Sequence, residues 1–102
     1  MAKVTLSATA LMNLESIHEY ISKDAEFYAD KVIAKILQRI TILETHPMIG
    51  KVVREFGNPL VRELIEGKYK IIYEIISEGE ISVLRIYHGA RLLKDLKIKP
   101  GL

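Results

Sequence analysis

The sequence predicts an α+β fold in which an N-terminal helical hairpin packs on a small antiparallel sheet. Apolar residues recur every three or four positions as far as residue 45, which is the period of amphipathic helices. Strong turn formers then occupy 47–58, and three β-type runs follow with short turns between them. Strands in series after a pair of helices form a layered fold, with the helices over one face of the sheet and the other face free to carry a site.

The length of 102 residues predicts a single domain over 1–102, because so short a chain cannot form two cores that each bury enough surface. Hydrophobic residues make up 49% of the chain and charged residues 27%, a balance that excludes a disordered protein. No apolar run reaches the roughly 18 residues of a membrane span, and the start of the chain has no apolar secretory stretch. We therefore expect a cytoplasmic protein that does not bind membranes.

Missing residue types and motifs exclude several kinds of chemistry. The chain has no cysteine, which excludes disulfides, thiolate metal sites and cysteine nucleophiles. It also lacks the HExxH, GxxxxGK[ST], GxGxxG and GxSxG motifs of metal hydrolases, P-loop proteins, dinucleotide-binding proteins and serine hydrolases. We expect no metal and no other cofactor, so any chemistry has to come from basic, phenolic, hydroxyl or carboxylate side chains.

Two amphipathic segments predict the hairpin. A short strand over 3–6 leads into a helix that begins near residue 8, where Ser7 is a good N-cap. A second helix, capped by Asp24, follows over 25–45 and ends before Pro47. The apolar stripes expected to face the core are Leu11, Leu14, Ile17 and Ile21 in the first helix, and Ile33, Ile36, Leu37, Ile40 and Leu43 in the second. The segment 47–58 is expected to be a loop.

The three predicted strands span 60–65, 69–77 and 81–87 and form an antiparallel meander. A two-residue turn at Glu78-Gly79 would fix the register of the second hairpin. The expected cross-strand pairs are Ser77 with Glu80, Ile76 with Ile81, Ile72 with Arg85, and Lys70 with Tyr87. This register predicts a helix-facing set of Tyr69, Ile71, Tyr73, Ile75, Leu84, Ile86 and His88.

The same register leaves Lys70, Arg85 and Tyr87 on the open face of the sheet. The first hairpin has two possible registers. A three-residue turn over 66–68 brings Arg62 to the open face, whereas a two-residue turn sends it to the opposite face.

Basic residues are concentrated near the end of the chain. The net charge is only +2, but residues from 85 onward carry Arg85, Arg91, Lys94, Lys97 and Lys99 against Asp95 alone. Together with Arg62 and Lys70, these arginines could grip phosphate oxygens and stabilise charge during phosphoryl transfer. The alternative is that the strand cations pair with carboxylates of the same sheet, namely Glu63, Glu66 and Glu74.

His88 is the most informative titratable residue, because an imidazole can pass a proton at neutral pH. A histidine at a strand end is also commonly a structural hydrogen-bonding residue, so both interpretations stay open. His18 and His46 carry less information, since one lies within a predicted helix and the other at a helix end.

A series of short segments along the chain carries a family likeness. They are Pro47-Met48-Ile49-Gly50 with Val52-Val53-Arg54-Glu55-Phe56, then Val61-Arg62-Glu63-Leu64, Tyr69-Lys70-Ile71-Ile72-Tyr73, and Leu84-Arg85-Ile86-Tyr87-His88-Gly89-Ala90-Arg91. With the helical hairpin before them, they resemble the RelE/ParE superfamily of toxins from bacterial type II toxin–antitoxin systems. The resemblance implies a small α+β toxin that a cognate antitoxin neutralises by covering its surface.

The resemblance implies one of two cellular targets. RelE-like members cleave ribosome-bound messenger RNA by activating the ribose 2′-hydroxyl, and the catalytic residues would then be His88, Arg91, Arg62 and Lys70. ParE-like members bind DNA gyrase and trap it on cut DNA. The C-terminal tyrosine of the best-known ribosomal nucleases would fall near Lys97, and no tyrosine follows Tyr87. The chain therefore looks closer to the ParE-like branch, with the mRNA endoribonuclease as the alternative.

A third interpretation is a chain without toxin activity that binds its partner as a corepressor. In each case operator DNA would be reached only indirectly, through the antitoxin. The resemblance implies Arg85, Tyr87, Leu92, Leu93 and Lys94 as target- or partner-binding residues. The apolar side chains of Ile65, Ile76, Val83 and Leu92-Leu93 either contact the antitoxin, by groove docking or by sheet addition, or complete the core.

Overall fold

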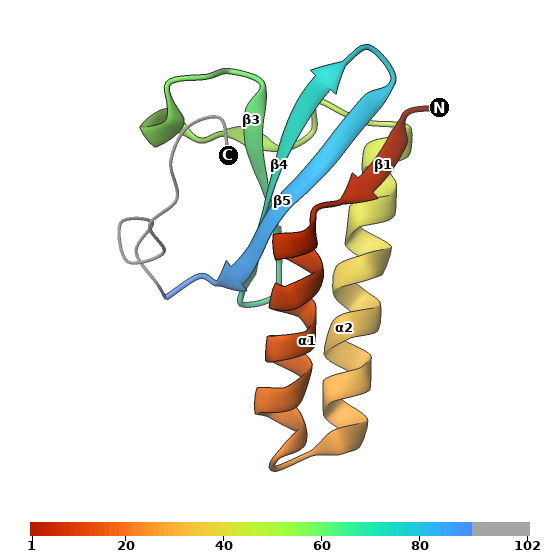
Figure 1. Cartoon of the computed structure of the whole chain (residues 1–102), viewed down its shortest axis with the longest axis vertical. Helices are drawn as coiled ribbons and strands as arrows, with labels where there is room; N and C mark the ends of the chain where they lie inside the picture. Colours follow the sequence, from red (N-terminus) through yellow and green to blue (C-terminus); the bar gives the residue numbers. More distant parts are fainter. Residues whose placement is uncertain (91–102) are drawn as a thin grey trace.

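The computed structural model describes residues 1–90 and shows two helices packed on one face of a five-stranded sheet (Figure 1). The elements, in order, are β1 (Lys3–Leu6), α1 (Ala8–Ser22), α2 (Glu26–Thr41), the short 3₁₀ helix η1 (Ile42–Glu44), β2 (Lys51–Val52), a second 3₁₀ helix η2 (Arg54–Phe56), β3 (Val61–Glu66), β4 (Tyr69–Ser77) and β5 (Glu80–His88). The spatial order of the strands is β1-β5-β4-β3-β2, and β1 runs parallel to β5 while the other pairs are antiparallel. The predicted fold class is confirmed.

The helical hairpin forms where the apolar spacing predicts it. The Ser7 hydroxyl caps α1 by accepting the Ala10 N–H at 3.0 Å, as expected. The predicted cap of α2 is wrong, because Ala25 is the N-cap and no side chain bonds there. The His18 Nε2 lies 2.6 Å from the Asp30 Oδ1 and joins the two helices.

Two residues of the predicted apolar stripes face solvent. Leu11 is 50% exposed and Leu37 is 41% exposed, whereas Ala10, Leu14, Ile36, Ile40 and Leu43 are buried. The reason is geometric: the buried line of α1 begins at Ala10 and continues through Leu14, so Leu11 is turned about 100° away from it. Alanine is only weakly apolar, so the sequence pattern places the start of this stripe at Leu11, whereas Leu14 and Ile17 face the core as predicted.

The sheet buries apolar side chains on both faces. The helix-facing cluster includes Leu64, Ile71, Tyr73, Val83 and Ile86 together with the buried helix residues. A second cluster on the other face consists of Val53, Phe56, Val61, Ile72 and Tyr87, with Leu84 packed against it. The segment predicted to be a loop supplies that cover, because it contains β2, which pairs with β3, and η2, which carries Phe56.

The β4–β5 hairpin keeps the predicted register at its ends and departs from it in the middle. Ile72 lies opposite Arg85 and Lys70 opposite Tyr87, as expected, but Tyr73 pairs with Val83 and Ile75 with Ile81. The register shifts between Ile72 and Tyr73, and again between Ile75 and Ser77. Such β-bulges add one unpaired residue to a strand and change which face the following side chains occupy.

The bulges correct three predictions. Ile76 is not opposite Ile81. Leu84 packs with the open-face cluster and not against the helices, while Val83 takes the helix-facing position and is fully buried. Val83 therefore completes the core and is not a surface for a partner. Ile65 and Ile76, the other apolar candidates within residues 1–90, are 56% and 49% exposed.

Candidate functional site

The first hairpin settles where Arg62 lies. Arg62 pairs with Tyr73, and the turn consists of two residues, with Gly67 in the left-handed region at φ 58°. Of the two registers considered, this is the one that sends Arg62 away from the open face. Its Nη1 donates to the carbonyl oxygens of Met48 at 3.2 Å and Gly50 at 2.9 Å.

The Tyr73 hydroxyl holds the same turn as Arg62. It donates to the Pro47 carbonyl at 2.7 Å and accepts the Gly50 N–H at 2.9 Å, and burial raises the pKa of this phenol. Gly50 has no room for a side chain, because an added Cβ would lie 2.5 Å from the Tyr73 hydroxyl oxygen and 2.8 Å from the Glu63 carbonyl. Arg62 and Tyr73 thus fix residues 47–50, the turn that leads into β2 and η2.

The open face of the sheet carries Lys70, Arg85 and Glu63. The Lys70 Nζ lies 3.8 Å from the Glu63 Oε1, so this lysine is paired with a carboxylate of its own sheet. Within residues 1–90, Arg85 forms no ion pair. Within the described residues the Arg85 guanidinium is therefore not committed to a carboxylate, which suits it to bind an anionic group.

Tyr87 lies on the open face but is covered. It is only 6% exposed and belongs to the cluster that contains Val53 and Phe56, so the prediction that its side chain faces solvent is wrong. Burial, followed by the nearby carboxylates of Glu63 and Glu55, raises its pKa to about 12. The segment 51–56 explains the difference, because sequence patterns gave no sign that it would fold over this strand.

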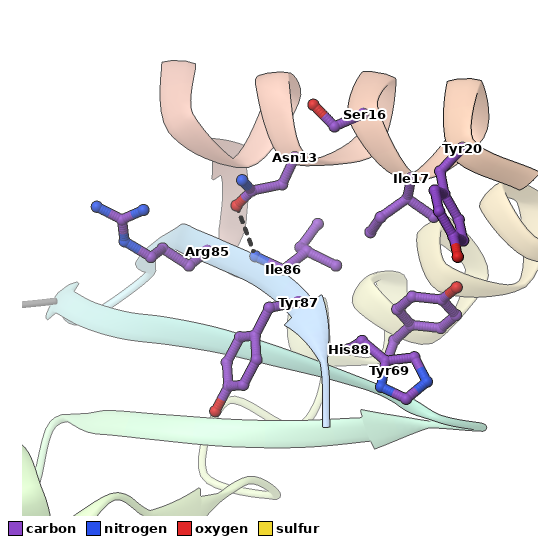
Figure 2. A pocket seen from close by; sticks show the side chains of 9 residues that line it. All are labelled: Asn13, Ser16, Ile17, Tyr20, Tyr69, Arg85, Ile86, Tyr87 and His88. Atoms are coloured by element: carbon purple, nitrogen blue, oxygen red, sulfur yellow. Dashed lines mark hydrogen bonds between the residues drawn. The ribbon is translucent and has the colours of Figure 1, made fainter. Parts of the chain in front are cut away.

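A groove of about 640 Å³ lies beside the open face, between α1 and the last part of β5 (Figure 2). Its lining consists of Asn13, Ser16, Ile17 and Tyr20 from α1, Tyr69 from β4, and Arg85, Ile86, Tyr87 and His88 from β5. The sequence patterns do not indicate this groove. The signal that could have revealed it is the spacing of Asn13, Ile17 and Tyr20, which places them on one side of α1 next to the core stripe.

His88 is an exposed residue at one end of the groove. Its ring meets the Tyr69 ring edge to face, with centroids 5.6 Å apart and an interplanar angle of 82°. The His88 Nδ1 accepts the Ala90 N–H at 3.1 Å, so in the neutral ring the proton sits on Nε2. Burial raises the pKa of the Tyr69 phenol, with smaller contributions from Tyr28 and Tyr20, and Tyr69 therefore stays protonated at neutral pH.

Helix α1 and its N-cap supply hydrogen-bond partners to the edge of β5 beside the groove. β1 pairs with β5 only as far as Val83. Beyond that point the Ser7 hydroxyl donates to the Leu84 carbonyl at 3.0 Å, and the Asn13 Oδ1 accepts the Ile86 N–H at 3.0 Å (Figure 2). Side chains of the helix and its cap thus replace a neighbouring strand.

The structure brings only part of the predicted site together. Lys70 and His88 lie near the same end of the sheet, since the Lys70 side chain is within 4 Å of the position that a Cβ on Gly89 would take. Arg62 is tethered to residues 48 and 50 on the other face. Arg91, Leu92, Leu93 and Lys94 lie outside the described residues.

Residues 1–90 contain neither a cluster of metal ligands nor a membrane-spanning helix. No group of three or more histidine, aspartate or glutamate side chains in this part of the chain is arranged to hold a metal ion. Neither described helix is long and apolar enough to cross a membrane.

Comparison with known proteins places the chain among toxins. The family model described as the ParE toxin of the type II toxin–antitoxin system parDE matches residues 4–93. Toxin RelE2 of Caulobacter vibrioides is 26% identical over 92 residues, which cover 90% of this chain and 100% of that protein.

Two solved structures share the fold. A chain of the chromosomal ParDE system from P. aeruginosa superimposes with a TM-score of 0.72 and 22% identity, covering 86% of this chain and 96% of that one. A chain of the RelBE2 toxin–antitoxin complex from Mycobacterium tuberculosis gives a TM-score of 0.63 and 21% identity, covering 85% and 96%. The family model covers most of the sequence, and the chain therefore belongs to the ParE toxin family of type II toxin–antitoxin systems.

Proposed function

We propose that this chain arrests growth by binding DNA gyrase and poisoning it, and that a cognate antitoxin neutralises it. The observation that carries this proposal is the separation of the cations expected in a nuclease site. Arg62 is held by the carbonyls of Met48 and Gly50, on the opposite face of the sheet from Lys70. A toxin that inhibits by binding alone does not require these groups to converge.

The chemistry of RNA cleavage also favours gyrase binding over a nuclease activity. In-line attack by a 2′-hydroxyl needs a base, an acid and positive charge around one phosphate. The Lys70 ammonium is already paired with the Glu63 carboxylate. The pKa of the Tyr87 phenol is raised to about 12, so it is a poor proton donor at neutral pH. The open face is better suited to contact a protein through Arg85. In this proposal the buried Tyr87 packs beneath the contact surface of the open face. Leu92, Leu93 and Lys94 extend the binding surface.

Purified chain tests the proposal in two parallel assays. We expect inhibition of gyrase supercoiling together with an accumulation of gyrase-linked DNA breaks, and no cleavage of a messenger on programmed ribosomes. The variant His88→Ala should keep gyrase inhibition within about twofold, because an imidazole is not needed for binding. Loss of growth arrest in a folded His88→Ala chain, with ribosome-dependent cleavage by the parent, would contradict the proposal.

The second candidate is a ribosome-dependent mRNA endoribonuclease. The likeness to Toxin RelE2 favours it, as does the closeness of Lys70 to the Gly89 turn beside His88. In this candidate function His88 is the acid or base, and Lys70, Arg62 and Arg91 supply positive charge. Because Arg62 bonds to two carbonyls, it would have to leave them to reach a phosphate on the open face.

We propose the antitoxin as the main partner, on the ground that the structural neighbours come from toxin–antitoxin systems. Contact with operator DNA is proposed to occur only through the antitoxin. Gyrase and ribosomes are both cytoplasmic targets, so the proposed location is the cytoplasm, with 1–102 acting as one domain. A non-toxic corepressor remains the outcome if induced, folded chain leaves growth, gyrase and messenger RNA unchanged.

A further inference from the structure

We propose that the outer face of the helical hairpin binds a second copy of this chain. This self-association goes beyond the proposed function and does not depend on which cellular target is correct. The outer face is the exposed side of α1 and α2, away from the buried side that carries Ala10, Leu14, Ile36 and Ile40. Figure 1 shows the two helices side by side, so their exposed sides form one continuous surface.

Two leucines lie on the outer face, at the junction of the helices. The contact between the His18 Nε2 and the Asp30 Oδ1, at 2.6 Å, shows which residues of the two helices are level. Leu11 lies about two turns before His18, and Leu37 lies about two turns after Asp30, so each leucine shares the side of its helix with that contact. Because the helices run antiparallel, the leucines are level with each other. They are 50% and 41% exposed, and covering them is favourable.

Small residues flank the two leucines. Ala8 precedes Leu11 by one turn, Ala34 precedes Leu37 by one turn, and both alanines are exposed. Side chains of this size allow the axes of two packed helices to approach closely. Met12, which is 65% exposed, adds apolar area beside Leu11. The outer face therefore has the composition of a helix-packing surface.

The two helices carry opposite charges on their exposed sides. α1 presents Glu15 and Glu19 and contains no lysine or arginine, whereas α2 presents Lys31 and Lys35. Within residues 1–90 none of these four side chains forms an ion pair, although the Lys31 Nζ lies 5.0 Å from the centroid of the Phe27 ring. The charges suit a partner that is basic where it meets α1 and acidic where it meets α2. A second copy of the hairpin has both properties.

A two-fold axis parallel to the helices brings the opposite charges together. It lays α1 of each copy antiparallel against α2 of the other, with no shift along the helices, as in a four-helix bundle. In the alignment of the hairpin, Glu15 is level with residue 33, which lies between Lys31 and Lys35. Glu15 of each copy therefore meets the two lysines of the other, and the leucines of both copies form one apolar layer.

The alternative two-fold arrangement is unfavourable. With the axis across the helices, α1 would lie against α1, and the carboxylates of Glu15 and Glu19 from both copies would repel each other. The carboxylates of α2 do not disturb the favoured arrangement, because Asp30 already contacts His18 and Glu26 lies in the first turn, at the far end of the hairpin from the leucines. The charges thus select one orientation of the second copy.

Sedimentation equilibrium of the purified full chain tests for self-association. We expect a mass of about twice that of one chain at a concentration of about 100 μM, because a few apolar side chains with ion pairs around them give a dimer of micromolar affinity. Raising the salt concentration from about 0.05 to about 0.5 M should weaken the dimer severalfold, since salt screens the opposite charges. The mass of a single chain at both salt concentrations would overturn the proposal.

Charge exchange tests which helices meet. Glu15→Lys with Glu19→Lys makes the exposed sides of both helices basic, and Lys31→Glu with Lys35→Glu makes both acidic. Each double variant should weaken self-association at least about tenfold. An equimolar mixture of the two double variants should recover the affinity of the parent, because each acidic helix then faces a basic one. Failure of the mixture to associate would overturn the proposed pairing of α1 with α2.

Leu37→Glu tests the apolar layer, since it places a carboxylate among the leucines. We expect this variant to lose at least about tenfold in affinity while keeping its helical circular dichroism, because Leu37 is partly exposed in the single chain. Two matched controls, Ile76→Glu on β4 and Glu78→Lys with Glu80→Lys at the β4–β5 turn, change exposed residues away from the hairpin and should stay within about twofold of the parent. An equal loss in Leu37→Glu and Ile76→Glu chains would overturn the assignment of the outer face.

Discussion

The polar ends of two side chains, Arg62 and Tyr73, fix the backbone of the segment that follows the helical hairpin. They face the same way because they are paired residues of β3 and β4, and together they hold the backbone of residues 47–50 by four hydrogen bonds. Segment 51–56 then lies over Tyr87 and Ile72. The position of these two residues therefore controls how much of the open face stays accessible to a target.

Tyr73→Phe tests this tether. The substitution removes the hydroxyl that donates to the Pro47 carbonyl and accepts the Gly50 N–H, leaving a buried amide without its partner. We expect the free energy of unfolding to fall by about 1 to 3 kcal/mol in urea denaturation. Tyr28→Phe, at a phenol that is 59% exposed, should stay within about 0.5 kcal/mol of the parent. Equal stability of the two variants would show that the tether does not contribute.

Tyr87 gives the fold a dependence on alkaline pH. Burial raises its pKa from 10.0 to about 12, so the folded state binds this proton more tightly than the unfolded chain. Its contribution to stability is fully present below pH 10 and is lost as the pH rises through about 12.

The measurement compares the parent with Tyr87→Phe. The difference in phenolate absorbance between the two chains should titrate near pH 12. Urea denaturation should show a shallower loss of stability in Tyr87→Phe over the same range, with part of the slope retained because burial also raises the pKa values of Tyr69 and Tyr73. Titration of Tyr87 near pH 10, where an exposed tyrosine titrates, would contradict the burial of this residue.

Among the elements, α1 both covers the sheet and closes the β5 edge. Asn13→Ala removes the acceptor of the Ile86 N–H, and Ile86 is buried, so we expect a loss of about 1 to 2 kcal/mol in unfolding free energy. Asn13→Asp keeps an acceptor oxygen and should recover most of that loss. Ser16→Ala, one turn further along the same side of α1, is the control and should be nearly neutral. If Asn13→Asp is as unstable as Asn13→Ala, the hydrogen bond is not the cause.

The elements themselves could be predicted from sequence because their periodicity is local. The three main strands, the two helices and the ends of the β4–β5 register follow from apolar spacing and from turns such as Glu78-Gly79. The bulges at Ile76 and Leu84 could not be predicted, since a compensating pair of bulges leaves the hairpin ends in register. The length of the turn at Gly67 determines which face Arg62 occupies. The residues of the turn are compatible with both a two-residue and a three-residue turn, so the sequence does not select one.

The candidate site was less predictable than the fold because its residues meet across long separations in sequence. Asn13 and Ile86 are 73 positions apart, and nothing in either neighbourhood indicates the other. The cover over Tyr87 comes from a segment without regular periodicity. The pairs Lys70 with Tyr87 and Ile72 with Arg85 were predicted correctly, because a short turn between adjacent strands fixes which residues lie opposite one another.

The whole molecule presents two surfaces that share Arg85. The open face carries it beside the pair of Lys70 and Glu63, and the groove beside α1 includes it in its lining. Figure 1 shows the helical hairpin of α1 and α2 extending past the end of β5. A partner that binds either surface would therefore contact the cation that we propose for target contact.

Gyrase poisoning is tested by the amount of DNA covalently linked to gyrase in cells that express this chain without an antitoxin. We expect a rise in linked DNA soon after induction, with cellular messengers left intact and with the rise abolished by co-expression of the antitoxin. Growth arrest with no increase in gyrase-linked DNA, accompanied by cleavage of messengers on ribosomes, would show that gyrase is not the target.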